Sequence, residues 1–254
     1  MSPARCLSIP LLVCALCAPA APGAAQTRGA TRTAYREPVY PDEPNQKDSQ
    51  GNVLLIGRID AKGNVTELHM ISATAREFVQ PALEAVREWK FQPALRDGKA
   101  IEIPLNAGVR FRKTGSERGV IPVPILGDLA VYPADASGAR TAPDAFPIRR
   151  GKDPALRAEA LLDVPPSEQP RTMTIRVEAI SPKGKRIPIF QPPLAVPALA
   201  TEVKFPVVAR VGSDWDEGVW ILTFTADGKG AGGGQFWLAS DPEHFSFVLP
   251  VSAP

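Results

Sequence analysis

The sequence holds little of the chemistry on which enzymes and metal sites depend. Its three cysteines, Cys6, Cys14 and Cys17, all stand close to the N-terminus, and it has only two histidines. Beyond Cys17 the chain therefore has no thiol for a disulfide, a thiolate zinc site or a cysteine nucleophile. Neither His69 nor His244 belongs to a cluster of His, Asp and Glu at regular metal-ligand spacing, so we expect no bound metal and no cofactor.

Motifs for ester and nucleotide chemistry are also missing. No Gly-x-Ser-x-Gly nucleophile elbow occurs. The glycine-rich run Gly230–Gly234 lacks the Lys-Ser/Thr pair of a phosphate loop and leads into no helical pattern. We therefore interpret it as part of the loop of a hairpin. The formal net charge is only +2, without a basic cluster interleaved with aromatics, which argues against nucleic-acid binding. The sequence thus favours a binding protein, not an enzyme.

The N-terminus has the pattern of an export signal. Arg5 is the only charge before the uncharged stretch from Cys6 to Gln26, whose centre is strongly apolar. Small residues end this stretch, so we predict that residues 1–25 are a signal peptide cleaved after Ala25, and that the protein is periplasmic. The alternative is an uncleaved membrane anchor, because the stretch is about long enough to span a bilayer. Three prolines interrupt it and favour the cleaved signal.

A small α+β module follows. Residues 26–36 are polar and basic, which predicts a short disordered lead. Apolar alternation over Gly51–Ala73, with a turn at Asp60–Asn64, predicts a hairpin. The period then changes to three and four residues, which predicts a helix from about Val79, and Ile101–Arg112 reads as a strand. We expect one main helix on a three-stranded antiparallel sheet. The apolar face of this helix contains Val79, Ala82, Leu83, Val86 and Trp89.

The remainder of the chain has an all-β character. Residues 114–119 are polar and predict a linker, and residues 120–254 predict an Ig-like β-sandwich, because short alternating segments are separated by turn signals. Phe236 and Trp237 are adjacent in one predicted strand and must therefore face opposite sides. The predicted strands are Leu129–Tyr132, Leu156–Val164, Met173–Ile180, Val203–Val211, Gly218–Ala226 and Gln235–Ala239.

Residues 37–113 resemble the C-terminal domain of the TonB energy-transducer family. Tyr40-Pro41 stands upstream, Gly51-Asn-Val53 opens a strand, and the hairpin turn follows in the family's order. The most specific strings are Ala82-Leu-Glu-Ala-Val86, Trp89-Lys-Phe91-Gln-Pro93-Ala94 and Asp97-Gly98-Lys99. The resemblance covers about a third of the chain.

The resemblance implies a sheet edge that binds an extended segment. In the family, that segment lies near the N-terminus of an outer-membrane transporter plug. An edge strand suits this role, because its unpaired N–H and C=O groups can pair with another strand. We expect a peptide or protein of the cell envelope as the partner, and a proline at Val109 to block the edge. The alternative is that the edge pairs with a second copy in a homodimer. The predicted partner-binding edge residues are Ile101, Ile103, Leu105, Ala107, Val109 and Phe111.

Two departures from the family argue against energy transduction. Gln26–Arg36 reaches at most about 40 Å when fully extended, which is short for a spacer across the periplasm. A long segment also follows residue 113, whereas the family ends with this domain. We therefore expect a periplasmic adaptor without enzymatic activity. The alternatives are a structural homodimer without a peptide ligand and an atypical transducer that keeps its N-terminal segment as an anchor.

Overall fold

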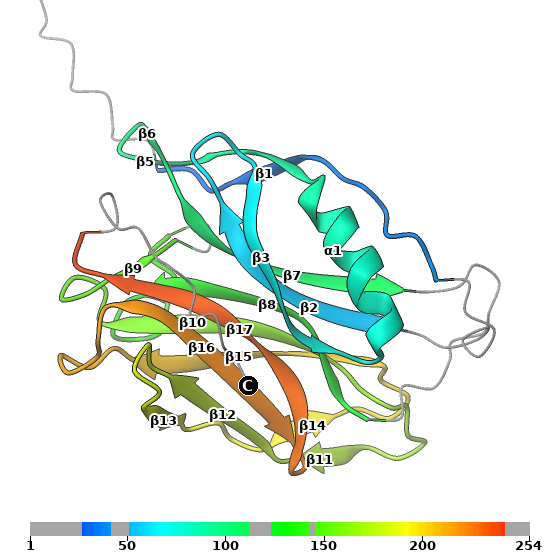
Figure 1. The fold of residues 1–254 in the computed structure, drawn as a ribbon. Helices are drawn as coiled ribbons and strands as arrows, with labels where there is room; N and C mark the ends of the chain where they lie inside the picture. Colours follow the sequence, from blue (N-terminus) through cyan, green and yellow to red (C-terminus); the bar gives the residue numbers. More distant parts are fainter. Residues whose placement is uncertain (1–26, 42–50, 112–122, 143–145, 242–254) are drawn as a thin grey trace, which may run out of the picture.

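The computed structural model describes residues 27–41, 51–111, 123–142 and 146–241, and it is mostly β with a single short α-helix (Figure 1). The predicted signal peptide, residues 1–25, and the predicted linker, residues 114–119, lie outside these ranges. Within the described ranges, no helix is long and apolar enough to cross a membrane.

The first domain is built on a three-stranded antiparallel sheet with the order β3-β2-β7. Strands β2 (Gly51–Ile59) and β3 (Val65–Ala73) form the predicted hairpin, and β7 (Ile103–Phe111) pairs with the other side of β2. A 3-10 turn, η2 (Arg76–Phe78), leads into α1 (Val79–Arg87), which begins where the sequence period changes. The helix covers one face of the sheet (Figure 1). The core between them includes Val53, Leu55, Phe78, Ala82, Val86, Trp89 and Val109.

The prediction of a disordered lead is wrong for part of residues 26–36. Thr31–Ala34 form strand β1, which pairs antiparallel with β4 (Lys90–Gln92) just beyond the helix. The guanidinium of Arg32 lies 4.6 Å from the ring centroid of Trp89, and the Trp89 indole N–H donates to the carbonyl of Arg36. All four residues of β1 are exposed, so the strand has no apolar alternation by which the sequence reveals it.

The predicted single strand Ile101–Arg112 is instead two strands. β6 (Lys99–Ile101) pairs with β5 (Ala94–Arg96) in a short hairpin, and β7 begins at Ile103. Asp97 and Gly98 both have positive φ in the turn of this hairpin, as the Asp-Gly sequence predicts.

The second domain consists of two main sheets and a small third one (Figure 1). Their strand orders are β15-β10-β8, β13-β12-β16-β17-β9 and β11-β14. Five of the six predicted strands are present as single strands, the first and last of them longer than predicted, and Phe236 and Trp237 face different cores as expected. The predicted strand Met173–Ile180 is instead divided: Met173 ends β11, which pairs with β14, whereas Ile175–Ile180 form β12, which pairs with β13 and β16. The Ig-like assignment stays a prediction. The strands are β8 (Ile125–Ala134), β9 (Ile148–Arg149), β10 (Ala155–Asp163), β11 (Arg171–Met173), β12 (Ile175–Ile180), β13 (Arg186–Ile189), β14 (Leu194–Val196), β15 (Glu202–Arg210), β16 (Gly218–Ala226) and β17 (Lys229–Ala239).

The prediction that the glycine-rich run Gly230–Gly234 is the loop of a hairpin is wrong. It lies inside β17 and pairs with β16, and the hairpin turn falls earlier, at Asp227-Gly228. A Cβ at Gly232 would lie 2.7 Å from Leu54, and a Cβ at Gly234 would lie 2.9 Å from Asn106. Gly232 and Gly234 therefore allow β17 to approach the sheet of the first domain closely.

The two domains share a closed interface. Alternate residues of β2 point to opposite faces: Val53 and Leu55 face the helix, whereas Leu54 and Ile56 pack against the second domain. Every residue of β2 is buried, as expected for a strand covered on both faces. The face of the sheet opposite the helix lies on β8 and β17, so the domains pack as one body.

Candidate strand-docking edge

The structure places all six predicted edge residues with their side chains in the core. The least buried, Leu105, is only 8% exposed, and Ile101 belongs to β6, not to β7. The side chains of these residues therefore cannot contact a partner directly. A partner that uses this edge must instead use the backbone of β7.

Hydrogen bonds of β2 determine which backbone groups of β7 point outward. The carbonyl of Asn52 accepts from the N–H of Thr74 (2.9 Å), and the N–H of Asn52 donates to the Thr74 hydroxyl (2.9 Å). Both groups of Asn52 thus face β3. Because Arg110 lies opposite Asn52 in an antiparallel pair, its N–H and C=O point away from β2, toward the outer edge.

The same orientation repeats along β7, because its register with β2 has no irregularity. Pro104, Asn106 and Gly108 share the outward orientation of Arg110, whereas the odd-numbered residues bond to β2. A proline at Val109 would therefore break the sheet, so that predicted edge block is wrong. Pro104 lacks an N–H at an outward position, where a proline costs no ladder hydrogen bond.

The opposite edge, β3, is irregular. Its register with β2 shifts between Leu54 and Leu55 and again between Ile56 and Arg58, and each shift inserts one extra residue into β3. Glu67 adds a positive φ of 47°, unusual for a residue other than glycine. Bulges and charges of this kind protect an edge from strand pairing. Among the described residues, β7 is thus the regular edge of the sheet.

The second domain lies directly beside β7. A Cβ at Gly108 would come within 2.0 Å of the carbonyl oxygen of Gly127, so β7 and β8 approach as closely as two backbones can. Arg110 donates to Asp163 (2.8 Å) and to Glu202 (2.7 Å), which belong to β10 and β15. The outer edge of β7 is therefore flanked by the sheet β15-β10-β8.

Comparison with known proteins assigns the first domain. A sequence profile of the family described as Gram-negative bacterial TonB protein C-terminal matches residues 36–112. Protein TonB of Vibrio cholerae is 31% identical over 84 residues, which are 33% of this chain and 34% of that protein. Protein TonB of Xanthomonas campestris is 34% identical over 74 residues, 27% of this chain and 33% of that protein.

Residues 36–112 form a TonB C-terminal domain. The predicted boundaries, 37–113, differ from the matched range by one residue at each end. This chain spans about a third of the length of the curated relatives it matches. A solution structure of the Pseudomonas aeruginosa TonB C-terminal domain is 19% identical and covers 35% of this chain and 90% of that one, with a TM-score of 0.31.

A pair of amides joins the TonB C-terminal domain to the second domain. The side-chain N–H of Asn106 donates to the carbonyl of Gln235 (2.9 Å), and the N–H of Gln235 donates to Asn106 Oδ1 (2.8 Å). The Gln235 side chain is fully buried and donates to the carbonyls of Gly57 and Leu105. This network fixes the register between the two domains, because a shift would leave buried polar groups unpaired.

A buried arginine strengthens the same contact. Arg58 of β2 is 5% exposed, and its guanidinium lies 5.4 Å from the ring centroid of Trp237 in β17. Two half-exposed carboxylates pair with it: Glu67 at 2.8 Å and Glu102 at 3.4 Å. The charge of Arg58 is thus neutralised within the protein, and the arrangement is structural.

The second domain also contributes Phe146 to the core of the TonB C-terminal domain. Phe146 is 1% exposed and belongs to the core that lies under α1, and the Arg96 guanidinium lies 5.0 Å from its ring centroid. Neither Phe146 nor the amide pair is predicted by the sequence. An isolated phenylalanine outside any periodic segment carries no signal, and the two amides are 129 residues apart.

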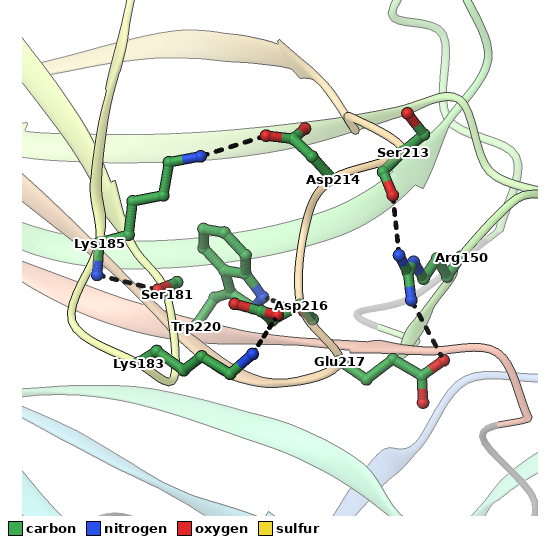
Figure 2. Close-up of polar contacts among 9 residues, drawn as sticks. All are labelled: Arg150, Ser181, Lys183, Lys185, Ser213, Asp214, Asp216, Glu217 and Trp220. Atoms are coloured by element: carbon green, nitrogen blue, oxygen red, sulfur yellow. Dashed lines mark hydrogen bonds and ion pairs between the residues drawn. The ribbon is translucent and has the colours of Figure 1, made fainter.

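Charged side chains also gather on loops of the second domain (Figure 2). Each carboxylate of the loop between β15 and β16 has a basic partner: Lys185–Asp214 at 3.1 Å, Lys183–Asp216 at 2.7 Å and Arg150–Glu217 at 3.9 Å. The hydrogen bond from Lys185 lowers the pKa of Asp214. The charges balance, and the described residues include no group of three that could hold a metal ion. These contacts join the loops to one another.

Proposed function

We propose that this protein is a TonB-like adaptor of the cell envelope that captures an extended peptide segment by adding it as a strand to β7. One observation carries the proposal: β7 is a regular edge strand with outward N–H groups at Asn106, Gly108 and Arg110, and outward C=O groups at these residues and at Pro104. Strand addition depends on such groups, because main-chain hydrogen bonds supply the affinity.

The partner class follows from the domain. Membership of residues 36–112 in the TonB C-terminal family supports a protein of the cell envelope as the partner, with an outer-membrane transporter as the first candidate. The export pattern of residues 1–25 supports a periplasmic location. Adaptor function requires no catalysis, in agreement with the missing nucleophile motifs and metal clusters of the sequence.

In this proposal the second domain would hold β7 in a fixed position. It covers the helix-free face of the sheet and holds β7 through Asn106 and Arg110. With both faces of β7 covered, the edge is the direction from which a partner strand can approach. An edge strand that is already held in place is pre-organised, which lowers the entropic cost of binding.

A pair of substitutions at one position tests the proposal. Arg110→Pro removes one outward N–H, whereas Arg110→Ala keeps that N–H and equally loses the ion pairs with Asp163 and Glu202. We expect envelope partners to co-purify with Arg110→Ala, and at least about tenfold less with Arg110→Pro, because a lost backbone bond also disturbs its neighbours. Equal capture by two folded variants would exclude strand addition at this part of β7.

The same experiment separates the alternatives. If the variants differ in self-association and neither wild type nor variant captures another protein, the edge serves a homodimer.

Mass spectrometry of the mature protein tests the alternative of a transducer that keeps its N-terminal segment as an anchor. A first residue at Gln26 is expected for the exported adaptor, and an intact residue 1–25 segment would support the anchor.

A further inference from the structure

We propose that the segment captured by β7 carries a basic residue flanked by two apolar residues, and that Asp128 of the second domain selects the basic residue. The inference rests on the proposed function, because it concerns a strand bound at the same edge. It adds the chemistry of the partner, and it makes the second domain part of the recognition site.

The pleat of the sheet determines where the side chains of a bound strand point. Directly paired residues in a sheet place their side chains on the same face. A residue opposite Gly108 would therefore point toward the second domain, as a Cβ at Gly108 does. Its two neighbours would follow Ala107 and Val109, which face the apolar core under the helix.

Asp128 lies at the position that the central residue would meet. Its Cα is 3.5 Å from the Cβ position of Gly108, the outward-facing residue in the middle of β7. The Asp128 side chain is exposed, and its Oδ1 accepts a hydrogen bond only from the adjacent backbone N–H of Leu129 (2.9 Å) among the hydrogen bonds of the described residues. A lysine or arginine opposite Gly108 would thus find a carboxylate with remaining acceptor capacity.

The surrounding charges favour the same choice. Arg110 is the cation of β7 closest to this point, and it already binds two carboxylates, Asp163 and Glu202. The nearest lysine on this sheet, Lys204 of β15, is separated from Asp128 by Leu161 in the strand between them. Among the described residues around this point, the carboxylates Asp128, Asp163 and Glu202 outnumber the basic Arg110 and Lys204, and this balance attracts a basic side chain and repels an acidic one.

A panel of synthetic peptides tests the inference on the full-length protein. The probes are fluorescein-labelled Ser-Thr-Val-X-Val-Thr-Ser peptides with blocked ends, where X is Lys, Gln or Glu. In low salt we expect the Lys peptide to bind about fivefold more tightly than the Gln peptide, and the Glu peptide to bind weakest, measured by fluorescence anisotropy. Asp128→Asn should remove the preference, whereas the control Asp214→Asn, an exposed aspartate of the loops in Figure 2, should keep it.

Two outcomes would overturn the inference. Equal affinities of the three peptides for the wild type would exclude charge selection, while loss of binding in Arg110→Pro would still support strand addition. Binding of none of the peptides would exclude this peptide chemistry as well. In that case the capture experiment with Arg110→Pro and Arg110→Ala still decides the proposed function independently.

Discussion

The sheet of the TonB C-terminal domain has two edges, and they differ in regularity and in the way the rest of the chain covers them. β7 keeps one register with β2 over nine residues, its helix-facing residues are buried and those on the other face are buried or partly buried, and Pro104 occupies a position that needs no N–H. β3 contains two extra residues and the positive φ of Glu67, and all of its residues are exposed or partly exposed.

This contrast indicates how one edge of a sheet can stay available for pairing while the other is protected. A long regular edge is an aggregation hazard, which natural proteins reduce with bulges, charges or prolines. β3 carries such protection and β7 carries little of it. The second domain instead holds β7 from the side, through Gly108, Asn106 and Arg110. We interpret this as protection of one edge and preservation of the other.

The largest expected loss of stability comes from a substitution that breaks the close contact between β7 and β8. Gly108→Ala would place a Cβ 2.0 Å from the carbonyl of Gly127, so one backbone must move. We expect the free energy of unfolding to fall by about 3 kcal/mol, measured by urea denaturation. The matched control is Gly230→Ala, where no atom lies within 4 Å of the added Cβ. Similar stabilities of the two variants would contradict the close approach of β7 and β8.

A smaller effect is expected at the amide pair. Asn106→Ala leaves the N–H and the C=O of buried Gln235 without their partner, which should cost about 2 kcal/mol of unfolding free energy. Gln80→Ala, on the exposed helix face, removes a hydrogen bond to Glu84 and should cost less than about 0.5 kcal/mol. If Asn106→Ala were as mild as Gln80→Ala, the pair would not fix the domain register.

The smallest effect concerns the turn that leads into β3. Burial tends to raise the pKa of Asp60, but hydrogen bonds from Asn64 and Lys62 outweigh it, so the pKa of Asp60 is lowered in the folded protein. Ionised Asp60 therefore stabilises the fold above its unfolded pKa of about 3.9, and this contribution is lost as the pH falls through the folded pKa. Asp60→Asn should lower Tm by less than about 2 °C at pH 7.

The pH dependence provides the control for that substitution. The difference in Tm between wild type and Asp60→Asn should shrink below pH 4 and vanish when Asp60 is protonated in both states. A difference in Tm that stays constant down to the lowest pH would show that the charge of Asp60 contributes nothing to the turn.

Much of the first domain follows from local patterns, and the interface does not. Periodicity gives the β2–β3 hairpin, the start of α1 and the main strands of the second domain. The prediction that Gly230–Gly234 form a hairpin loop is wrong. Glycine is common in loops, whereas in β17 Gly232 and Gly234 permit a second sheet to approach. β1 has no buried side, and the Asn106–Gln235 pair joins distant segments, so neither carries a local signal.

The sequence predicted a binding edge on the closing strand, and a partner at this edge stays a prediction. The family resemblance pointed to the closing strand, yet all six predicted residues turn their side chains into the core. Which backbone groups face outward depends on the register with β2 and on the contact between Asn52 and Thr74. That register is a tertiary property, so alternation in one strand cannot supply it.

Site-specific photo-crosslinking in living cells tests the central claim, that β7 and not β3 is the binding edge. One variant carries the photoreactive residue at position 110, beside the outer edge of β7, and the other at position 70, where Met70 of β3 is 43% exposed. We predict an adduct to an envelope protein from position 110 and none from position 70. An adduct from position 70 alone would contradict the claim.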